Sequence, residues 1–302
     1  MTDRQYSLAV CRFPGNNSEH PASSGWVIAT QPKWLADSRI SRVIPLRRSD
    51  TPITMVRNLL VKKALDDGAD YILMIDSDMQ PDVEPDGVPF WDSSWKFMMD
   101  RREKEESLLQ NLYEAEGEWL PGELEARAFR EFPPATIAAP YCGPAPNECV
   151  YVMKWEVGEG NTRQPNHKLK MFERSEASRF GGIMEVAALP TGLILYDARV
   201  FKHLPPPWFD YEFADEPYRT AKSCTEDIYQ TRNASLIGMS QFINWNSWAG
   251  HIKPKVVRKP RPVFIDEVPD KMADAIRRGI RGDQKVVILT SPEDPIERPP
   301  TA

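Results

Sequence analysis

Short apolar runs separated by polar stretches mark the strands expected in the first part of the chain. Residues 6–11 (YSLAVC) and 41–46 (SRVIPL) are typical of strands, and the polar residues 16–25 between them are expected to form a loop. Residues 71–75 (YILMI) are apolar without interruption, as in a strand that is buried on both faces of a parallel sheet.

A helical period separates the second and third of these strands. Apolar residues recur at helical spacing over 52–67, with Thr51 placed as N-cap, Pro52 at the first helical position and Gly68 as the stop. Strand, helix and strand in this order predict a βαβ unit with a right-handed crossover.

The second half of the chain continues the mixed pattern. Residues 92–131 are rich in Lys, Glu and Arg and predict one or two amphipathic helices inserted over the site, whose charge is most simply a solvated face. Strands are expected at 135–141, 183–196 (two runs, interrupted at Pro190-Thr191-Gly192) and 240–245, a hairpin over 149–157 and 168–173, and a helix over 225–238.

The character of the sequence changes after Pro254. A basic run from Lys253 to Arg261 precedes a helix predicted over 267–281, and the last dozen residues are expected to be disordered. The basic run has three interpretations: a solvated tail, a diphosphate contact through Lys253, or attraction of an anionic acceptor.

Composition narrows the class of protein. The 302 residues are 41% hydrophobic and 27% charged, as in ordinary globular proteins, and the net charge of −6 argues against a protein that binds mainly by neutralising phosphates. With no signal peptide and no apolar stretch long enough to span a bilayer, we expect a soluble, cytoplasmic protein. The four cysteines form no C-x-x-C pair and are expected to be reduced thiols.

The triplet Asp76-Ser77-Asp78 is the first candidate for chemistry. It follows the buried strand at its carboxyl end, which is where ligands bind in open α/β sheets. Carboxylates there hold either a ribose or a hard cation, and Mg²⁺ and Mn²⁺ take a few carboxylates with substrate phosphates completing the shell. A solvated acidic turn is the alternative interpretation.

A second acidic pair, Glu226-Asp227, begins the helix predicted at 225–238, with Thr225 as its N-cap. Acids in a first helical turn commonly do no more than compensate the helix dipole. A carboxylate close to a metal-bound diphosphate is also suited to act as a general base.

Together these motifs resemble the donor half and the acceptor half of GT-A glycosyltransferases. Arg57-Asn58 on the helix, Asp-Gly-Ala-Asp, the apolar strand and Asp76-Ser77-Asp78-Met79 are followed in order by Thr191-Gly192, Glu226-Asp227 and His251. The pattern is most similar to the inverting family-2-like group, which has many bacterial and phage members, and it covers about residues 6–254.

The resemblance implies a Rossmann-like α/β fold with a mixed, mostly parallel sheet flanked by helices. It implies a GT-A domain at 1–254, made of a nucleotide-binding half (1–90), a helical insertion (92–131) and an acceptor half (132–254). Residues 255–302 would form a C-terminal extension.

The resemblance also implies roles for single residues. Asp76, Asp78 and His251 would hold Mn²⁺ or Mg²⁺, and Asp227, rather than its neighbour Glu226, would deprotonate an acceptor hydroxyl. The donor would be a nucleoside diphosphate sugar, with UDP expected first, and the acceptor a glycan, a modified nucleic acid or a protein. The residues expected at the donor or sugar are Arg12, Phe13, Pro14, Asp50, Arg57, Asp76, Ser77, Thr191, Gly192 and Lys253.

Two other functions stay open at this stage. A nucleotidyltransferase would use clustered carboxylates and a metal on a related fold, but would release pyrophosphate instead of a nucleoside diphosphate. A non-catalytic protein that binds nucleotide sugars or nucleic acid would bind the donor without turnover and would be insensitive to Asp227→Asn.

Overall fold

A computed structural model of the chain describes residues 4–14, 19–49, 52–115, 121–143, 149–156, 168–213 and 222–252. All of them belong to the first of two compact units, Met1–Lys253 and Pro254–Ala302. Asp50, Thr51, Lys253, the helix predicted at 267–281 and the tail expected to be disordered lie outside the described residues.

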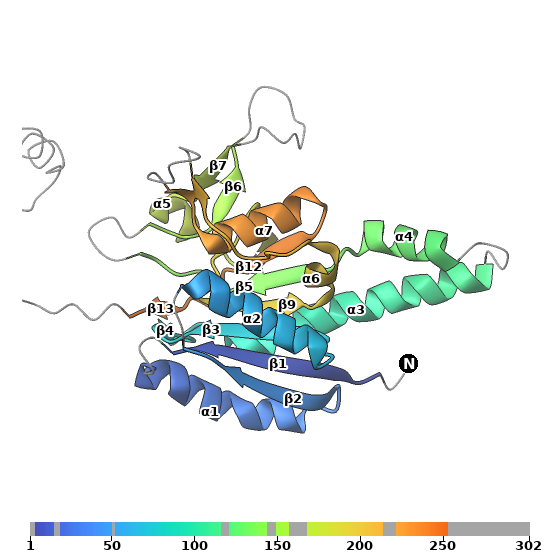
Figure 1. The fold of residues 1–302 in the computed structure, drawn as a ribbon, viewed down its shortest axis with the longest axis horizontal. Coiled ribbons are helices and arrows are strands. Elements are labelled where there is room, and N and C mark those ends of the chain that lie inside the picture. Colours follow the sequence, from blue (N-terminus) through green and yellow to red (C-terminus); the bar gives the residue numbers. More distant parts are fainter. Residues whose placement is uncertain are drawn as a thin grey trace, which may run out of the picture. The chain divides into compact units, whose positions relative to one another are not determined.

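A seven-stranded sheet forms the centre of the first unit, in the order β2-β1-β3-β9-β5-β12-β8 (Figure 1). β1 pairs in parallel with β2 and β3, and β5 with β12, whereas β9 and β8 run antiparallel to their neighbours. The predicted α/β class, with a mixed and mostly parallel sheet, is therefore confirmed. The strands are β1 (Tyr6–Phe13), β2 (Ile40–Arg47), β3 (Tyr71–Asp76), β5 (Ala135–Ala138), β8 (Ile183–Glu185), β9 (Leu193–Asp197) and β12 (Ser240–Asn244).

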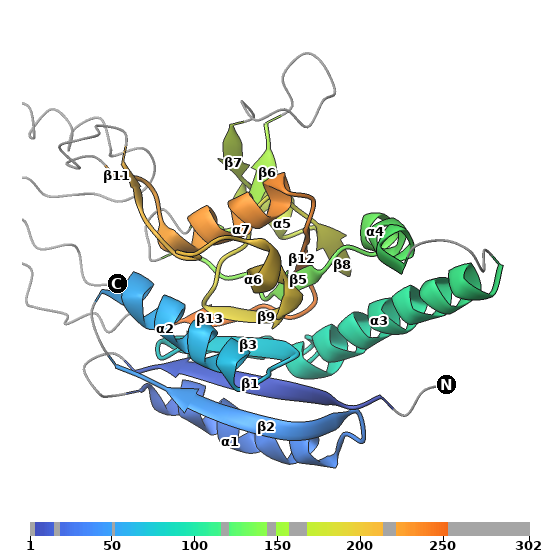
Figure 2. The ribbon, with the colours of Figure 1, turned by 45° about the vertical axis from the view of Figure 1, so that its right-hand side comes forward.

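Helices cover both faces of this sheet (Figure 2). Ala9, Cys11 and Met74 point to the face that carries α2 (Ile53–Asp66), whereas Leu8 and Leu73 point to the face that carries α1 (Pro21–Ala36) and α3 (Phe90–Ala115). α7 (Glu226–Leu236) lies on the α2 side, where Tyr196 of β9 donates to Gln230 at 3.1 Å. Alternate strand residues thus feed two separate cores, as the uninterrupted apolar runs require.

Helix α1 corrects one sequence expectation. Residues 16–25 were expected to form a loop, but the helix begins at Pro21, where the ring of His20 accepts from the amide of Ala22 at 3.2 Å. The sequence signal is weak because Pro32 lies inside the helix and the buried stripe consists only of Ser23, Val27, Thr30 and Trp34.

Helix α2 was placed correctly but differs in detail. Its N-cap is Pro52 itself, without a side-chain cap, so Pro52 does not occupy the first helical position. Met55 and Leu59, expected on the apolar face, are 44% and 37% exposed. The buried face includes Val56, Leu60, Ala64 and one charged residue, Arg57.

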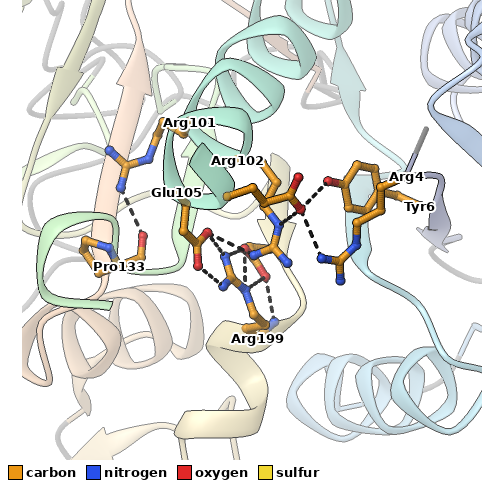
Figure 3. A network of polar contacts seen from close by, with 9 residues as sticks. Arg4, Tyr6, Arg101, Arg102, Glu105, Pro133 and Arg199 are labelled. Atoms are coloured by element: carbon orange, nitrogen blue, oxygen red, sulfur yellow. Dashed lines mark hydrogen bonds and ion pairs between the residues drawn. The ribbon is translucent and has the colours of Figure 1, made fainter. Parts of the chain in front are cut away.

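The charged segment 92–131 forms two helices, α3 and α4 (Pro121–Glu131), as predicted. They were expected over the site, but Arg102 and Glu105 of α3 lie beside Tyr71, at the end of β3 that is opposite to the acidic triplet. The charge of this segment is more than a solvated face, because Glu105 of α3 is only 6% exposed. Arg199 donates to Glu105 at 2.6 and 2.8 Å and to Asp197 at the end of β9, and Arg102 donates to Glu105 at 3.0 Å (Figure 3). This buried network ties α3 to the sheet.

Short ladders and turns complete the unit. The predicted hairpin is present as β6 (Met153–Trp155) and β7 (Leu169–Met171). The sequence did not predict two further ladders or two short helices: β10 (Glu212–Phe213) with β11 (Lys222–Cys224), β4 (Met79–Gln80) with β13 (Gly250–His251), α5 (Arg174–Ala177) and α6 (Arg199–His203).

Two further expectations concern thiols and membranes. All four cysteines are free, and Cys11 and Cys224 are buried. Burial raises the pKa of the Cys11 thiol. Within the part of the chain that the structure describes, no helix has both the length and the apolar character that crossing a bilayer requires.

Candidate functional site

The acidic triplet lies at the carboxyl end of β3, at the edge of the sheet. Strand β3 ends at Asp76, whose amide donates to the carbonyl of Gly192 at 2.8 Å, so the start of β9 lies directly beside it. After the turn, β4 pairs with β13, which sets His251 opposite Met79. The amide of Ile252 donates to the carbonyl of Asp78 at 2.7 Å, which fixes the late segment against the triplet.

Asp78 and His251, predicted as metal ligands, meet in the structure. Nε2 of His251 lies 3.3 Å from Oδ2 of Asp78. Nδ1 of His251 lies 3.1 Å from the carbonyl oxygen of Cys142, and because that oxygen can only accept, Nδ1 carries a hydrogen. Nε2 of His251 therefore faces the carboxylate of Asp78, and either a hydrogen on Nε2 or a cation bound by both groups makes this contact favourable.

Asp76 has a different partner. Nη2 of Arg57 donates to both of its carboxylate oxygens at 2.9 Å, while Nη1 donates to the hydroxyl of Thr191 and, at 3.3 Å, to Glu226. The Arg57 side chain is 3% exposed and lies 5.5 Å from the centre of the Phe13 ring. Arg57 therefore holds together three segments that are distant in the sequence.

Arg57 serves two carboxylates at once. Burial alone lowers the pKa of Arg57, but the charges of Asp76 and its acidic neighbours outweigh burial and raise that pKa. The pKa of Asp76 is raised to about 6, first by burial and then by the negative charges of Asp78 and Glu226, against the opposing effect of Arg57. One buried guanidinium is thus shared by Asp76 and Glu226.

Glu226 and Asp227 occupy the first turn of α7, as the sequence predicted, and Thr225 is the N-cap by position. The Thr225 hydroxyl donates to Oδ1 of Asp227 instead of capping the backbone, and the amide of Ile228 donates to the same oxygen at 2.8 Å. Glu226 is engaged by Arg57, whereas Oδ2 of Asp227 accepts no hydrogen bond from the described residues. The two acids therefore differ in their freedom to take a proton.

A cleft of about 950 Å³ opens over these groups. His251, Glu226 and Asp227 all line it, together with Tyr141 and Tyr151. The ring centres of Tyr141 and His251 are 5.1 Å apart, so the imidazole is supported by an aromatic edge. The volume is within the range of small-molecule sites.

Gly192 has a steric role in the wall of the site. A Cβ at this position would lie 2.8 Å from Sδ of Met79 and 2.8 Å from Cε1 of Tyr141. The neighbouring Thr191 is 1% exposed and accepts from Arg57. The Thr-Gly bend therefore permits close packing between β3, β9 and the aromatic wall, and a larger residue would push these elements apart.

The remaining predicted donor residues lie along the same edge. The carbonyl of Ser77 accepts from the amide of His20 at 2.9 Å. Arg12 forms an ion pair with Glu19, and Phe13 and Pro14 are buried, Phe13 beneath Arg57. Trp208 and Phe209 follow three prolines, and aromatic residues at such a place could stack on a sugar. They belong to the core instead, with Phe209 1% exposed.

The three predicted metal ligands do not form one group. No three His, Cys, Asp or Glu side chains come together as a metal cage anywhere in the described segments. Asp78 and His251 form a pair, whereas Asp76 directs both oxygens at Arg57. A carboxylate and an imidazole still fit Mn²⁺ or Mg²⁺, because such ions take one or two protein ligands and complete their shells with phosphate oxygens and water.

Several residues of the site were missed by sequence reasoning. Tyr141 and Tyr151 are ordinary core-type residues in sequence, and the Cys142 carbonyl that orients His251 has no side-chain signal. Glu19, paired with Arg12 and 3.4 Å from Arg47, lies in a stretch that was expected to be a loop. Contacts of this kind depend on the tertiary arrangement.

Comparisons with known proteins show weak likeness in fold only. No protein-family model matches the sequence, and neither does any curated protein. Among solved structures, A197 from STIV is 12% identical with a TM-score of 0.45, covering 82% of this chain and 86% of the other.

Two further structures are similar to a comparable degree. GalNAc-T7, solved with UDP, GalNAc and Mn²⁺, is 10% identical with a TM-score of 0.40, and the match covers 84% of this chain but 45% of that protein. A putative glucose-1-phosphate thymidylyltransferase from Bacillus anthracis, solved with a sucrose, is 10% identical with a TM-score of 0.37, covering 92% and 98%. At such scores the activity has to be argued from the site itself.

Proposed function

We propose that this chain is a metal-dependent glycosyltransferase of the GT-A type, which moves a sugar from a nucleoside diphosphate sugar to a hydroxyl acceptor. The observation that carries the proposal is the meeting of Asp78 and His251, two electron-pair donors 3.3 Å apart, at a cleft that is also lined by Asp227. A divalent cation is the group that relieves this contact and attracts phosphate oxygens.

The charge balance supports the same proposal. A diphosphate carries negative charge, and the buried guanidinium of Arg57 is already engaged by Asp76 and Glu226. Carboxylates beside a diphosphate repel it unless a cation accompanies it. The metal, when bound, supplies Lewis-acid stabilisation of the negative charge that develops on the leaving diphosphate.

The protein's own residues would bind the metal, position the acids and accept the acceptor's proton. Asp78 and His251 would hold the metal, and the Cys142 carbonyl keeps the imidazole in the tautomer that leaves Nε2 available. Arg57 positions Asp76 and Glu226. Asp227 would take the acceptor proton on Oδ2, because Oδ1 is held by the Thr225 hydroxyl and the Ile228 amide. Attack from the side of Asp227, opposite the leaving group, would invert the anomeric carbon.

The first experiment is a donor screen with Mn²⁺, in which release of free nucleoside diphosphate is measured. We expect slow hydrolysis of one donor without any acceptor, with UDP-sugars tried first, and loss of the activity in EDTA. Asp78→Asn should reduce release at least about 100-fold, since several kcal/mol of charge stabilisation is removed. The matched control is Asp86→Asn, because Asp86 is exposed and lies in a turn.

A second measurement does not depend on turnover. Mn²⁺ should raise the melting temperature of the wild type and of Asp86→Asn, but not of Asp78→Asn or His251→Ala. Release of pyrophosphate instead of a nucleoside diphosphate would identify a nucleotidyltransferase. Binding of every donor without turnover, unaffected by Asp227→Asn, would contradict catalysis altogether.

A further inference from the structure

The β6–β7 hairpin presents a hydrocarbon wall to the cleft. Met153 pairs with Met171 across the two strands, and Leu169 lies on the same side, so all three side chains line the cleft. The alternate residue Lys154 instead binds Glu176 at 2.7 Å and is not part of the cleft. Met153, Leu169 and Met171 thus give the hairpin an apolar surface toward the cleft, and Lys168, which precedes β7, lines the cleft beside them.

This wall is continuous with the catalytic end of the cleft. Ile228, the residue next to Asp227, forms a cluster with Ala188 and Cys224, against which Met153 and Leu169 pack. The cluster therefore leads from the proposed base to Met171, which remains 40% exposed although it lines the cleft. Exposed thioethers next to a reaction site are adaptable contacts for apolar groups.

The charged residues of the same cleft are mostly neutralised. Arg232 and Glu212 bind each other through two hydrogen bonds, one of them 2.8 Å long, so neither is left to recognise a charged ligand. Lys168 is exposed at the end of the hairpin and has no side-chain hydrogen bond or ion pair with the residues that the structure describes. Among the described residues, the wall between Ile228 and Met171 is made of the apolar side chains of Met153 and Leu169.

We propose that the acceptor carries its reacting hydroxyl on an apolar, hydrocarbon body that lies along Ile228, Met153, Leu169 and Met171. The inference rests on the proposed glycosyl transfer and specifies its acceptor. The acceptor oxygen bonds to the anomeric carbon, the bond from that carbon to the diphosphate breaks with its electron pair on the diphosphate, and the hydroxyl proton passes to Asp227. The hydrocarbon body supplies binding energy remote from the reacting atoms.

The test uses linear alcohols from ethanol to 1-hexanol as acceptors, with the donor found in the screen and Mn²⁺ present. The ratio of alkyl glycoside to free sugar is measured at equal alcohol concentration, because this ratio is independent of how well the donor binds. Full burial of one methylene strengthens binding up to about fourfold, and contact with a wall on one side about twofold. The four methylenes that separate ethanol from 1-hexanol should therefore raise the ratio of alkyl glycoside to free sugar about 10- to 20-fold.

Variants locate the effect. Met171→Glu should flatten the dependence of the ratio of alkyl glycoside to free sugar on chain length, and Met171→Leu should retain the dependence. Lys170→Glu is the matched control, since it brings the same new carboxylate to the neighbouring residue on the other face of the hairpin. Met171 and Lys170 are both exposed, so these changes leave the fold intact.

The outcomes separate this inference from the proposed function. A flat alcohol series in the wild type, with donor hydrolysis present, would overturn the apolar acceptor and leave glycosyl transfer standing. A rising series that Met171→Glu does not change would place the apolar contact elsewhere and overturn the role of the wall. Absence of hydrolysis with every donor would remove the proposed function itself.

Discussion

Two clusters of arginine and carboxylate side chains lie at opposite ends of β3, and they are built differently. Beside Tyr71, at the start of the strand, Glu105 and Asp197 are matched by Arg199 and Arg102 (Figure 3). At the other end, the single guanidinium of Arg57 serves Asp76 and Glu226, with Asp78 and Asp227 close by.

The difference separates a structural cluster from a candidate site. Where each buried charge has its partner inside the protein, the cluster needs nothing from outside and ties α3 to the sheet. At the Arg57 cluster, Asp76 and Glu226 share one guanidinium, and the pKa of Asp76 is raised to about 6, first by burial and then by the charges of Asp78 and Glu226. Under the proposed function, a cation and a phosphate ligand would complete this cluster.

The largest effect is expected from Arg57→Met. It leaves Asp76 and Glu226 without their common partner, so the free energy of unfolding should fall by about 3 kcal/mol, at the lower end for buried pairs because Asp76 remains 23% exposed. Donor hydrolysis should fall at least about 100-fold as the segments that it joins shift. Urea unfolding and diphosphate release measure the two effects, and a variant of wild-type activity would contradict the organising role of Arg57.

A smaller effect, confined to stability, is expected from Arg199→Met. Glu105 loses its principal partner, but Arg199 is itself 28% exposed, so we expect a loss of about 2 kcal/mol in the free energy of unfolding. Diphosphate release per folded molecule should stay unchanged, because this cluster lies at the far end of β3. If Arg199→Met impaired turnover as strongly as Arg57→Met, the distinction between the two clusters would be lost.

The smallest effect is expected from a third pair, Asp37 with Arg39. The pKa of Asp37 is lowered, mainly by the Arg39 side-chain hydrogen bond and further by Arg39's amide and Trp95, although burial opposes this. A lowered pKa means that the contribution is present above the unfolded-state value of about 3.9 and is lost as the pH falls through the folded-state value. At pH 7 the free energy of unfolding of Asp37→Asn should be lower than that of the wild type by about 1 kcal/mol or less. This difference should disappear below about pH 4, as measured by urea unfolding at several pH values.

Sequence patterns identified most of the sheet because its strands are uninterrupted apolar runs, such as YILMI, that only a buried strand accommodates. Helix α1 was not predicted because a proline, Pro32, lies inside it and two of its four buried residues, Ser23 and Thr30, are polar. The ladder of β4 with β13 was not predicted, because each strand has only two residues and so shows no periodicity in the sequence.

The candidate site was foreseen in its residue types more than in its contacts. His251 and Asp227 line the cleft, and Asp78 lies 3.3 Å from His251. These three residues could be named beforehand because the order of the motifs and the ends of the strands can be recognised in the sequence. The sequence did not indicate that Arg57 is buried or that it donates two hydrogen bonds to Asp76. It also did not indicate that the Cys142 carbonyl orients His251. Each of these depends on segments far apart in the sequence, such as α2, the Thr191 bend and α7, approaching one another in the folded chain.

The small ladder between β4 and β13 also bears on the order in which the molecule comes into being. Synthesis delivers the amino-terminal strands first, and β1, β2 and β3 can associate while the later chain does not yet exist. Asp78, however, waits for His251, which is brought to it by the last described strand. A nascent chain that ends before that histidine would carry the strands of the central sheet but only one of the two proposed metal ligands, so under the proposed function it would fold without becoming active.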